Sequence, residues 1–204
     1  MFNITLAIIF ITSLISISGF RQTRLIDELI FWPPAIQKQH QYYRFITCGL
    51  IHADYMHLIF NMVTLYFFGT IMEAHYQGIL GLQKWYYLAL YIGALIVSNI
   101  PTYIKHRNDA DYRSLGASGA VSAVLFAFIL LSPWQRIYVI VFPVPAIIYG
   151  GIFLFYSAYM SRKGGDHVNH DAHFYGALFG VLFTIAVRPD VVDVFLNELK
   201  HPQF

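Results

Sequence analysis

Apolar residues along this chain fall into long runs that are separated by shorter polar stretches. Most of these runs approach the roughly 20 residues that an α-helix needs to cross a hydrocarbon layer of about 30 Å. The pattern therefore predicts an all-α polytopic membrane protein with six transmembrane helices, folded as a single domain over residues 1–204. The expected spans are residues 2–20, 55–72, 85–100, 115–131, 137–160 and 172–187.

Prolines set several of the predicted span ends. We expect Pro101 to end the third span and Pro133 to end the fourth, because proline interrupts a helix. Residues 136–142 are interpreted as an interfacial strip, with the regular part of the fifth helix beginning near Pro145. Residues 21–53 form a long connection whose aromatic content suits the membrane interface.

The first apolar run allows two interpretations. Residues 2–20 carry no charge and are long enough to span a membrane as a retained helix. The segment Ser16-Ile17-Ser18 could also pass for the cleavage site of a signal peptide. No Lys or Arg precedes the apolar run, although a signal peptide normally begins with a positively charged region. We therefore expect a retained helix.

Composition supports the membrane class and excludes several others. The chain is 57% hydrophobic and 12% charged, whereas a soluble domain usually has about 25% charged residues. The net charge is +2, and the basic residues are scattered over loops, so nothing indicates a nucleic-acid partner. Cys48 is the only cysteine, which excludes an intrachain disulfide and a thiolate metal cluster. We expect a multi-pass integral membrane protein in contact with the lipid bilayer.

Three polar clusters occur at matching depths in the second, fourth and sixth spans. They are the pair His57 and Asn61, the residue Ser118, and the residue His173. Alternate spans enter from the same membrane face, which we call the site face. At a rise of 1.5 Å per residue, the first turns of these spans lie only several ångströms below that face. Polar groups in spans usually face the bundle interior or a cavity, so we predict that the clusters share one water-accessible site.

The residue types indicate nucleophilic catalysis. A serine hydroxyl becomes an effective nucleophile when a base removes its proton, and Ser118 with His173 supplies that pair. The reaction also develops an oxyanion, which requires fixed hydrogen-bond donors. His57 and Asn61 are four residues apart and project from one helix face. Together with the Ser118 amide they are the expected donors.

Glycines surround the candidate nucleophile and line the sixth span. Gly116 and Gly119 remove bulk beside Ser118 and permit a tight turn. Gly176 and Gly180 form a G-x-x-x-G face. Such a face allows the sixth helix to approach the fourth closely, which would bring the histidine of the sixth span toward the serine.

Taken together, these motifs resemble the rhomboid family of intramembrane serine proteases. The likeness covers about residues 42–187. A G-x-S-G motif alone would be a weak signal, but the motifs occur in the expected order on the second, fourth and sixth spans. The matching segments are Tyr43-Arg44-Phe45, His52, His57-Leu58-Ile59-Phe60-Asn61, Gly116-Ala117-Ser118-Gly119, and Ala172-His173-Phe174-Tyr175-Gly176-Ala177-Leu178-Phe179-Gly180.

The resemblance implies a serine endopeptidase that cleaves transmembrane segments of membrane-protein substrates through an acyl-enzyme. It implies a Ser118–His173 dyad and an oxyanion hole formed by His57, Asn61 and the Ser118 amide. Such catalysis needs no metal or organic cofactor. We expect the protein in a bacterial inner (plasma) membrane. Some bacterial members carry an aromatic residue four positions after the serine, stacked under the histidine, and this chain has Ser122 there.

Loop charges and the resemblance disagree on membrane orientation. Nine Lys and Arg residues fall on the loops of the site face and four on the opposite side. The positive-inside rule would place the site face in the cytoplasm. The family places it on the outer side. We follow the family, because several of the basic residues lie in the first loop at the interface.

Two other classes of protein remain as alternatives. His167, His170 and His173 recur every three residues and could ligate a metal or haem, although this would leave Ser118 unexplained. A rhomboid-like protein that binds without catalysis is the second alternative. Asp171 lies close to the histidine, but residues two apart on a helix do not face each other, so we expect a dyad rather than a triad.

Overall fold

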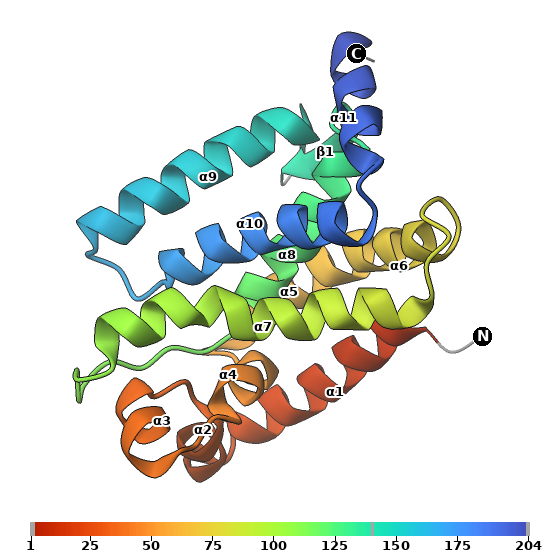
Figure 1. The fold of residues 1–204 in the computed structure, drawn as a ribbon. Coiled ribbons are helices and arrows are strands. Elements are labelled where there is room, and N and C mark those ends of the chain that lie inside the picture. Colours follow the sequence, from red (N-terminus) through yellow and green to blue (C-terminus); the bar gives the residue numbers. More distant parts are fainter. Residues whose placement is uncertain (1–2, 140, 203–204) are drawn as a thin grey trace.

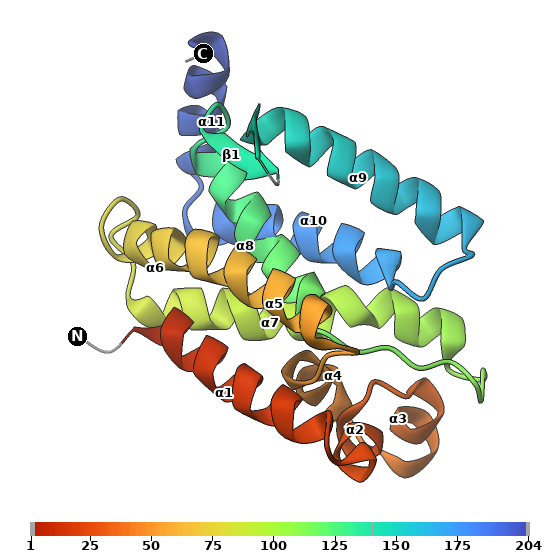
Figure 2. The ribbon, with the colours of Figure 1, turned by 180° about the vertical axis from the view of Figure 1, so that it is seen from behind.

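The structure is a computed structural model that describes residues 3–139 and 141–202 of the chain. It is a helical bundle built around α8 (Ser118–Leu131), which is buried along almost its whole length. Figures 1 and 2 show α8 in the middle of the molecule from both sides. The surrounding helices are α5 (Tyr55–Thr64), α6 (Thr70–Gln77), α7 (Lys84–His106), α9 (Ala146–Lys163) and α10 (His170–Val187).

Helices α8 and α10 pack in backbone contact. A Cβ atom at Gly176 would overlap the carbonyl oxygen of Gly119, and one at Gly180 would overlap the carbonyl oxygen of Ala123. Only glycine therefore permits this approach, as expected for a small-residue helix interface. The contact fixes the first turn of α10 beside the first turn of α8.

Three helical segments of the described chain are long and apolar enough to cross a membrane. They are Tyr55–Gln77, Lys84–His106 and His170–Val187. The first of these joins α5 and α6 through a π-helical segment, η2 (Leu65–Gly69). The helices α1 (Ile4–Gly19) and α8 are apolar but shorter. The fold is therefore mainly helical, with three candidate spans, and the count of six spans stays a prediction.

The region predicted as the fifth span, 137–160, begins as a β-hairpin, and its regular helix begins near Pro145 as expected. Strands β1 (Arg136–Val139) and β2 (Phe142–Pro145) pair antiparallel, and α9 starts only at Ala146. The two prolines of β2 lack the N–H groups that a helix needs, and they are tolerated at the edge of a sheet. Residue 140 lies outside the described residues.

Other predicted span boundaries also differ from the structure. The helical segment of the second span continues past residue 72 to Gln77. Helix α7 continues through Pro101 to His106. Proline within a membrane-buried helix is tolerated where neighbouring helices satisfy the freed backbone groups. The fourth helix begins at Ser118 rather than at residue 115, because the preceding residues form the tight turn described below. The first predicted span corresponds to α1, with Phe2 outside the described residues.

The long first connection is helical rather than irregular. It forms a lobe beside α1 and the C-terminal part of α7 (Figure 1). Its buried Arg44 donates hydrogen bonds to the carbonyl oxygens of Asp27 and Ile30, at 2.9 and 2.6 Å, which closes the lobe on itself. Its elements are α2 (Thr23–Leu29), α3 (Pro33–Gln39), α4 (Arg44–Thr47) and the 3₁₀ turn η1 (Cys48–Leu50).

A buried carboxylate attaches the start of α1 to α6. Glu73 accepts hydrogen bonds from the backbone N–H groups of Ile4 and Thr5 at 2.8 and 2.9 Å. It also accepts one from the Thr5 hydroxyl at 2.9 Å. The carboxylate thus supplies acceptors to two backbone N–H groups of the kind that an α-helix leaves unpaired at its N-terminus. At the other end of the chain, α11 (Val191–Lys200) follows α10 and packs against α8.

Candidate active site

Ser118 and His173 lie within hydrogen-bonding distance of each other. The hydroxyl oxygen of Ser118 is 2.7 Å from Nε2 of His173. Ser118 is the first residue of α8, and His173 belongs to the first turn of α10, which Asn169 caps by accepting the N–H of Ala172. Both residues are partly buried. The structure thus brings together the two residues that the sequence paired.

The backbone before the serine turns sharply at Gly116, whose φ is +118°. Side-chain-bearing residues rarely adopt this conformation. The ring of His57 packs directly against the same glycine, and a Cβ atom there would lie 2.7 Å from its Cε1 atom. Gly116 therefore permits both the turn and the close approach of His57 to the backbone beside the serine.

The His57 side chain has a hydrogen-bond donor to offer at this position. Its Nδ1 atom accepts the N–H of Ala53 at 3.4 Å, so in the neutral ring the proton resides on Nε2. Asp54 caps the helix by accepting the N–H of His57 at 2.8 Å. His57 and Asn61, both on α5, are linked, because Asn61 Nδ2 donates to the His57 carbonyl at 2.9 Å. One N–H of the Asn61 amide then remains for another acceptor.

The structure assigns contacts to His52, for which the sequence indicated no role. Its Nε2 atom accepts the N–H of Ala117, immediately before the serine, at 3.3 Å. Its Nδ1 atom lies 3.0 Å from the hydroxyl of Ser16 on α1, and that hydroxyl donates to the Leu50 carbonyl. The His52 ring is 1% exposed, and burial lowers its pKa to about 3. A neutral imidazole therefore connects α1 to the turn that holds Ser118.

A small polar cavity lies beside the serine. Its volume is about 10 Å³, which is roughly the room that one water molecule needs. The hydroxyl of Ser98 is buried there without a hydrogen-bond partner among the described residues. The polar residues that line the cavity are Ser98, Asn99, Ser114, Ser118 and Asn169.

Asp171 is engaged away from His173. Its carboxylate accepts a hydrogen bond from the Ser161 hydroxyl on α9 and pairs with Lys105 Nζ of α7 at 3.3 Å. Among the described contacts, the Asp171 carboxylate therefore bonds to Ser161 and Lys105 and not to the His173 ring. Within the described residues, no group of three His, Cys, Asp or Glu side chains is arranged to hold a metal ion.

Fold and site together define a helical membrane protein with a serine–histidine pair where two of its inner helices begin. Comparison with known families agrees with this class. The model described as "Rhomboid domain" matches residues 39–190. This chain belongs to the rhomboid family, and it is an integral membrane protein.

Several known proteins share part of their length with this chain. It is 28% identical over 163 residues to "RHOMBOID-like protein 12, mitochondrial" of Arabidopsis thaliana, which covers 74% of this chain and 48% of that protein. It is 32% identical over 91 residues to "Putative rhomboid protease YdcA" of Bacillus subtilis, covering 45% and 42% respectively. It is 33% identical over 136 residues to "Presenilin-associated rhomboid-like protein, mitochondrial" of Rattus norvegicus, covering 65% and 34%. The chain thus spans about half or less of these relatives.

Proposed function

We propose that this protein is an intramembrane serine endopeptidase that cleaves transmembrane segments of membrane-protein substrates. The observation that carries the proposal is the 2.7 Å contact between the Ser118 hydroxyl and Nε2 of His173. A serine so placed has the base that it needs to become a nucleophile. Family membership and the protease named among the relatives support the same activity.

The proposed reaction proceeds in two halves. In the first, His173 takes the hydroxyl proton of Ser118 while the serine oxygen forms a bond to the carbonyl carbon of the substrate peptide. The oxyanion receives hydrogen bonds from the Ser118 amide, His57 and Asn61. His173 then gives its proton to the leaving nitrogen, the C–N bond breaks, and an ester remains on the serine.

Hydrolysis of the ester completes the cycle. A water gives one proton to His173 while its oxygen bonds to the ester carbon. The proton then returns to the Ser118 oxygen as the carboxylic acid product leaves. The polar cavity of about 10 Å³ beside the serine provides room for such a water.

We further propose that six helices cross the membrane, with the site face on the outer side, and that the protein resides in a bacterial inner membrane. The starts of α5, α8 and α10 would then share that face. The location stays a prediction, since the relatives named above include mitochondrial proteins as well as one from Bacillus subtilis.

A fluorophosphonate probe tests the proposal directly, because it reacts with an activated serine and needs no substrate helix. We expect the detergent-solubilised protein to be labelled and Ser118→Ala to show background labelling only. Ser122→Ala is the matched control, since Ser122 is buried one turn further along the same helix. It should be labelled like the wild type. An unlabelled wild type would indicate a catalytically silent binding protein and overturn the proposal.

A further inference from the structure

The candidate base has little to orient it by hydrogen bonding. In a serine–histidine–aspartate triad, a carboxylate holds the imidazole in position. Here Asp171 is engaged by Ser161 and Lys105, and within the described part of the chain the His173 ring makes one hydrogen bond, to Ser118. The position four residues after the serine is Ser122 rather than an aromatic residue. The ring must therefore be oriented by packing.

A phenylalanine from another helix forms an offset stack with this ring. Phe153 of α9 lies nearly parallel to the His173 ring, with centroids 5.9 Å apart and an interplanar angle of 27°. Phe153 is itself held by aromatic neighbours, Phe126 of α8 at 5.7 Å and Tyr149 at 5.9 Å. Contacts of this geometry are favourable beyond the burial of area that they bring.

A second ring contacts His173 nearly at right angles. His170 meets it with centroids 5.8 Å apart and an angle of 80°. Nε2 of His170 lies 3.0 Å from the Asp166 carboxylate in the loop before α10, and Tyr156 of α9 packs edge-on against the same ring at 5.5 Å. His173 thus lies between two rings. Phe153 belongs to α9, and His170 is contacted by α9 through Tyr156.

We propose that Phe153 is a positioning residue for the catalytic base, so that alignment of His173 toward Ser118 depends on α9 being packed against α10. The inference rests on the proposed function. Phe153 touches neither the serine oxygen nor the expected oxyanion donors in any described contact; it acts through the imidazole. Removing its ring would widen the range of orientations of His173 without altering the groups that react.

The C-terminal end of α9 is tethered in a way that keeps Phe153 in place. Ser161 donates to the Asp171 carboxylate in the first turn of α10. Lys105 at the end of α7 donates to the same carboxylate at 3.3 Å and to the Ser161 carbonyl at 3.4 Å. Three helices thus meet at one carboxylate on the site face. Loosening this tether should act on the base through Phe153.

Phe153→Leu tests the proposal against a matched variant on the same helix. Phe155→Leu removes the same ring from a side chain that is 75% exposed on the outer surface of α9. We expect Phe153→Leu to slow fluorophosphonate labelling roughly threefold to tenfold, the range expected for one aromatic contact. Phe155→Leu should label like the wild type, and Phe153→Tyr should keep most of the rate. With a cleavable transmembrane peptide, kcat should fall while KM stays constant.

The tether is tested by combining variants. Ser161→Ala should slow labelling in the wild-type background and add nothing in the Phe153→Leu background, because the residue through which it acts is already absent. Equal slowing in both backgrounds would overturn the coupling between α9 and the base. Labelling of Phe153→Leu at the rate of Phe155→Leu would overturn the positioning role, whereas a wild type without labelling would overturn the proposed function itself.

Discussion

At the scale of single residues, the candidate site depends on groups that do not react. His52 is the clearest of these, since its neutral ring accepts the amide next to the serine and reaches Ser16 on α1. The sequence identified His52 only as a match to the family. Its role depends on a contact between residues 65 positions apart, and no local pattern reports such a contact.

Replacing His52 should have an effect that depends on pH. His52→Leu leaves the buried Ala117 N–H without an acceptor, so we expect the free energy of unfolding at pH 7.5 to fall by about 1–3 kcal/mol. The pKa of His52 is about 3 in the folded protein and 6.5 in the unfolded chain, so the unfolded chain binds more protons between these values. Wild-type stability therefore decreases as the pH falls through this window, and the variant lacks that loss.

Chemical denaturation in detergent at pH 7.5 and pH 4.5 measures both effects. The difference in the free energy of unfolding between the wild type and His52→Leu should be smaller at pH 4.5 than at pH 7.5. His201→Leu, a change in an exposed histidine of the C-terminal tail, should follow the wild type at both values. A deficit that stays constant or grows on acidification would show that His52 is not held neutral by the fold.

At the scale of elements, the contact between α8 and α10 determines where the serine and histidine meet. The G-x-x-x-G pattern predicted a close helix approach, and a Cβ atom at either glycine would overlap the backbone of α8. Gly180 lies two turns beyond the histidine, so a change there tests the helix contact without blocking the site itself.

Gly180→Ala should destabilise the protein and reduce its reactivity together. The added methyl would overlap backbone atoms of Ala123, and overpacking of this kind costs about 1–3 kcal/mol. Because the helices would have to separate, fluorophosphonate labelling should fall as well. Gly151→Ala is the matched control, since a Cβ atom there meets no atom within 4 Å. It should leave labelling unchanged and keep or slightly raise stability. Thermal unfolding and labelling rates of the two variants provide the comparison.

The sequence predicted the cores of the apolar helices better than their ends. Hydrophobic runs report burial in lipid or protein, and α1, α5, α7, α8 and α10 all fall on such runs. Their ends depend on tertiary support: Pro101 stays inside α7, whereas the prolines near residue 144 accompany a hairpin. An apolar run cannot distinguish these outcomes, because the same hydrophobicity suits a helix, an edge strand or an interfacial loop.

At the scale of the whole molecule, the alternation of helix direction brings the starts of α5, α8 and α10 together at the candidate site. Chain order and the depth of each polar cluster are enough to predict this pairing, and the structure places Ser118 beside His173. They do not predict the contact of Phe153, because α9 carries no polar residue at that position and the stacking partner belongs to another helix. An aromatic residue that contacts a histidine from a neighbouring helix leaves no motif in the sequence.

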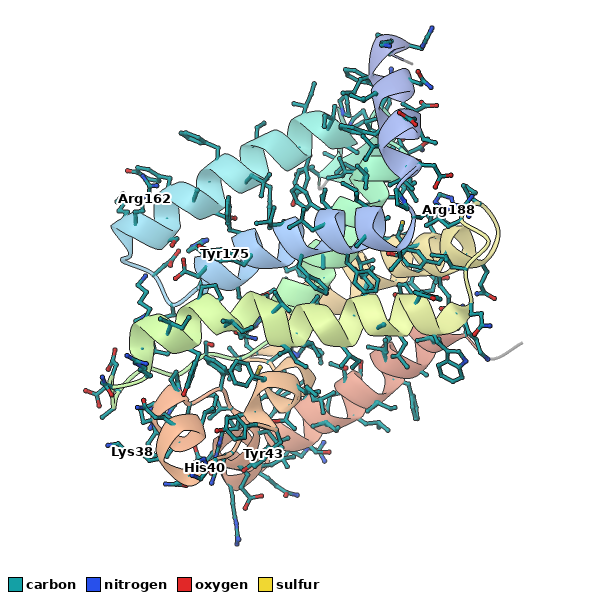
Figure 3. The ribbon with its side chains drawn as sticks, in the orientation of Figure 1. Lys38, His40, Tyr43, Arg162, Tyr175 and Arg188 are labelled. Carbon is teal, nitrogen blue, oxygen red and sulfur yellow. The ribbon has the colours of Figure 1, made fainter. Side chains whose placement is uncertain are left out.

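Orientation in the membrane is also a property of the whole molecule. Figure 3 shows Lys38, His40, Tyr43 and Arg162 toward one side of the bundle and Arg188 on the other. A reporter fused after Phe204 should give a cytoplasmic signal if the site face is outside. The same reporter inserted after Gly165, in the loop between α9 and α10, should give an external signal. The reverse pair of signals would agree with the loop charges instead and refute the family placement.

The carboxylate of Glu73 has a consequence for the biogenesis of the protein. Its hydrogen-bond donors include two amides and a hydroxyl near the beginning of α1, so it depends on that helix remaining attached. A processing enzyme that cut after residue 18 would remove the hydrogen-bond donors of the buried Glu73 carboxylate. It would also remove Ser16, which contacts the His52 ring. Cleavage at that point would therefore remove buried hydrogen bonds that support the turn before Ser118.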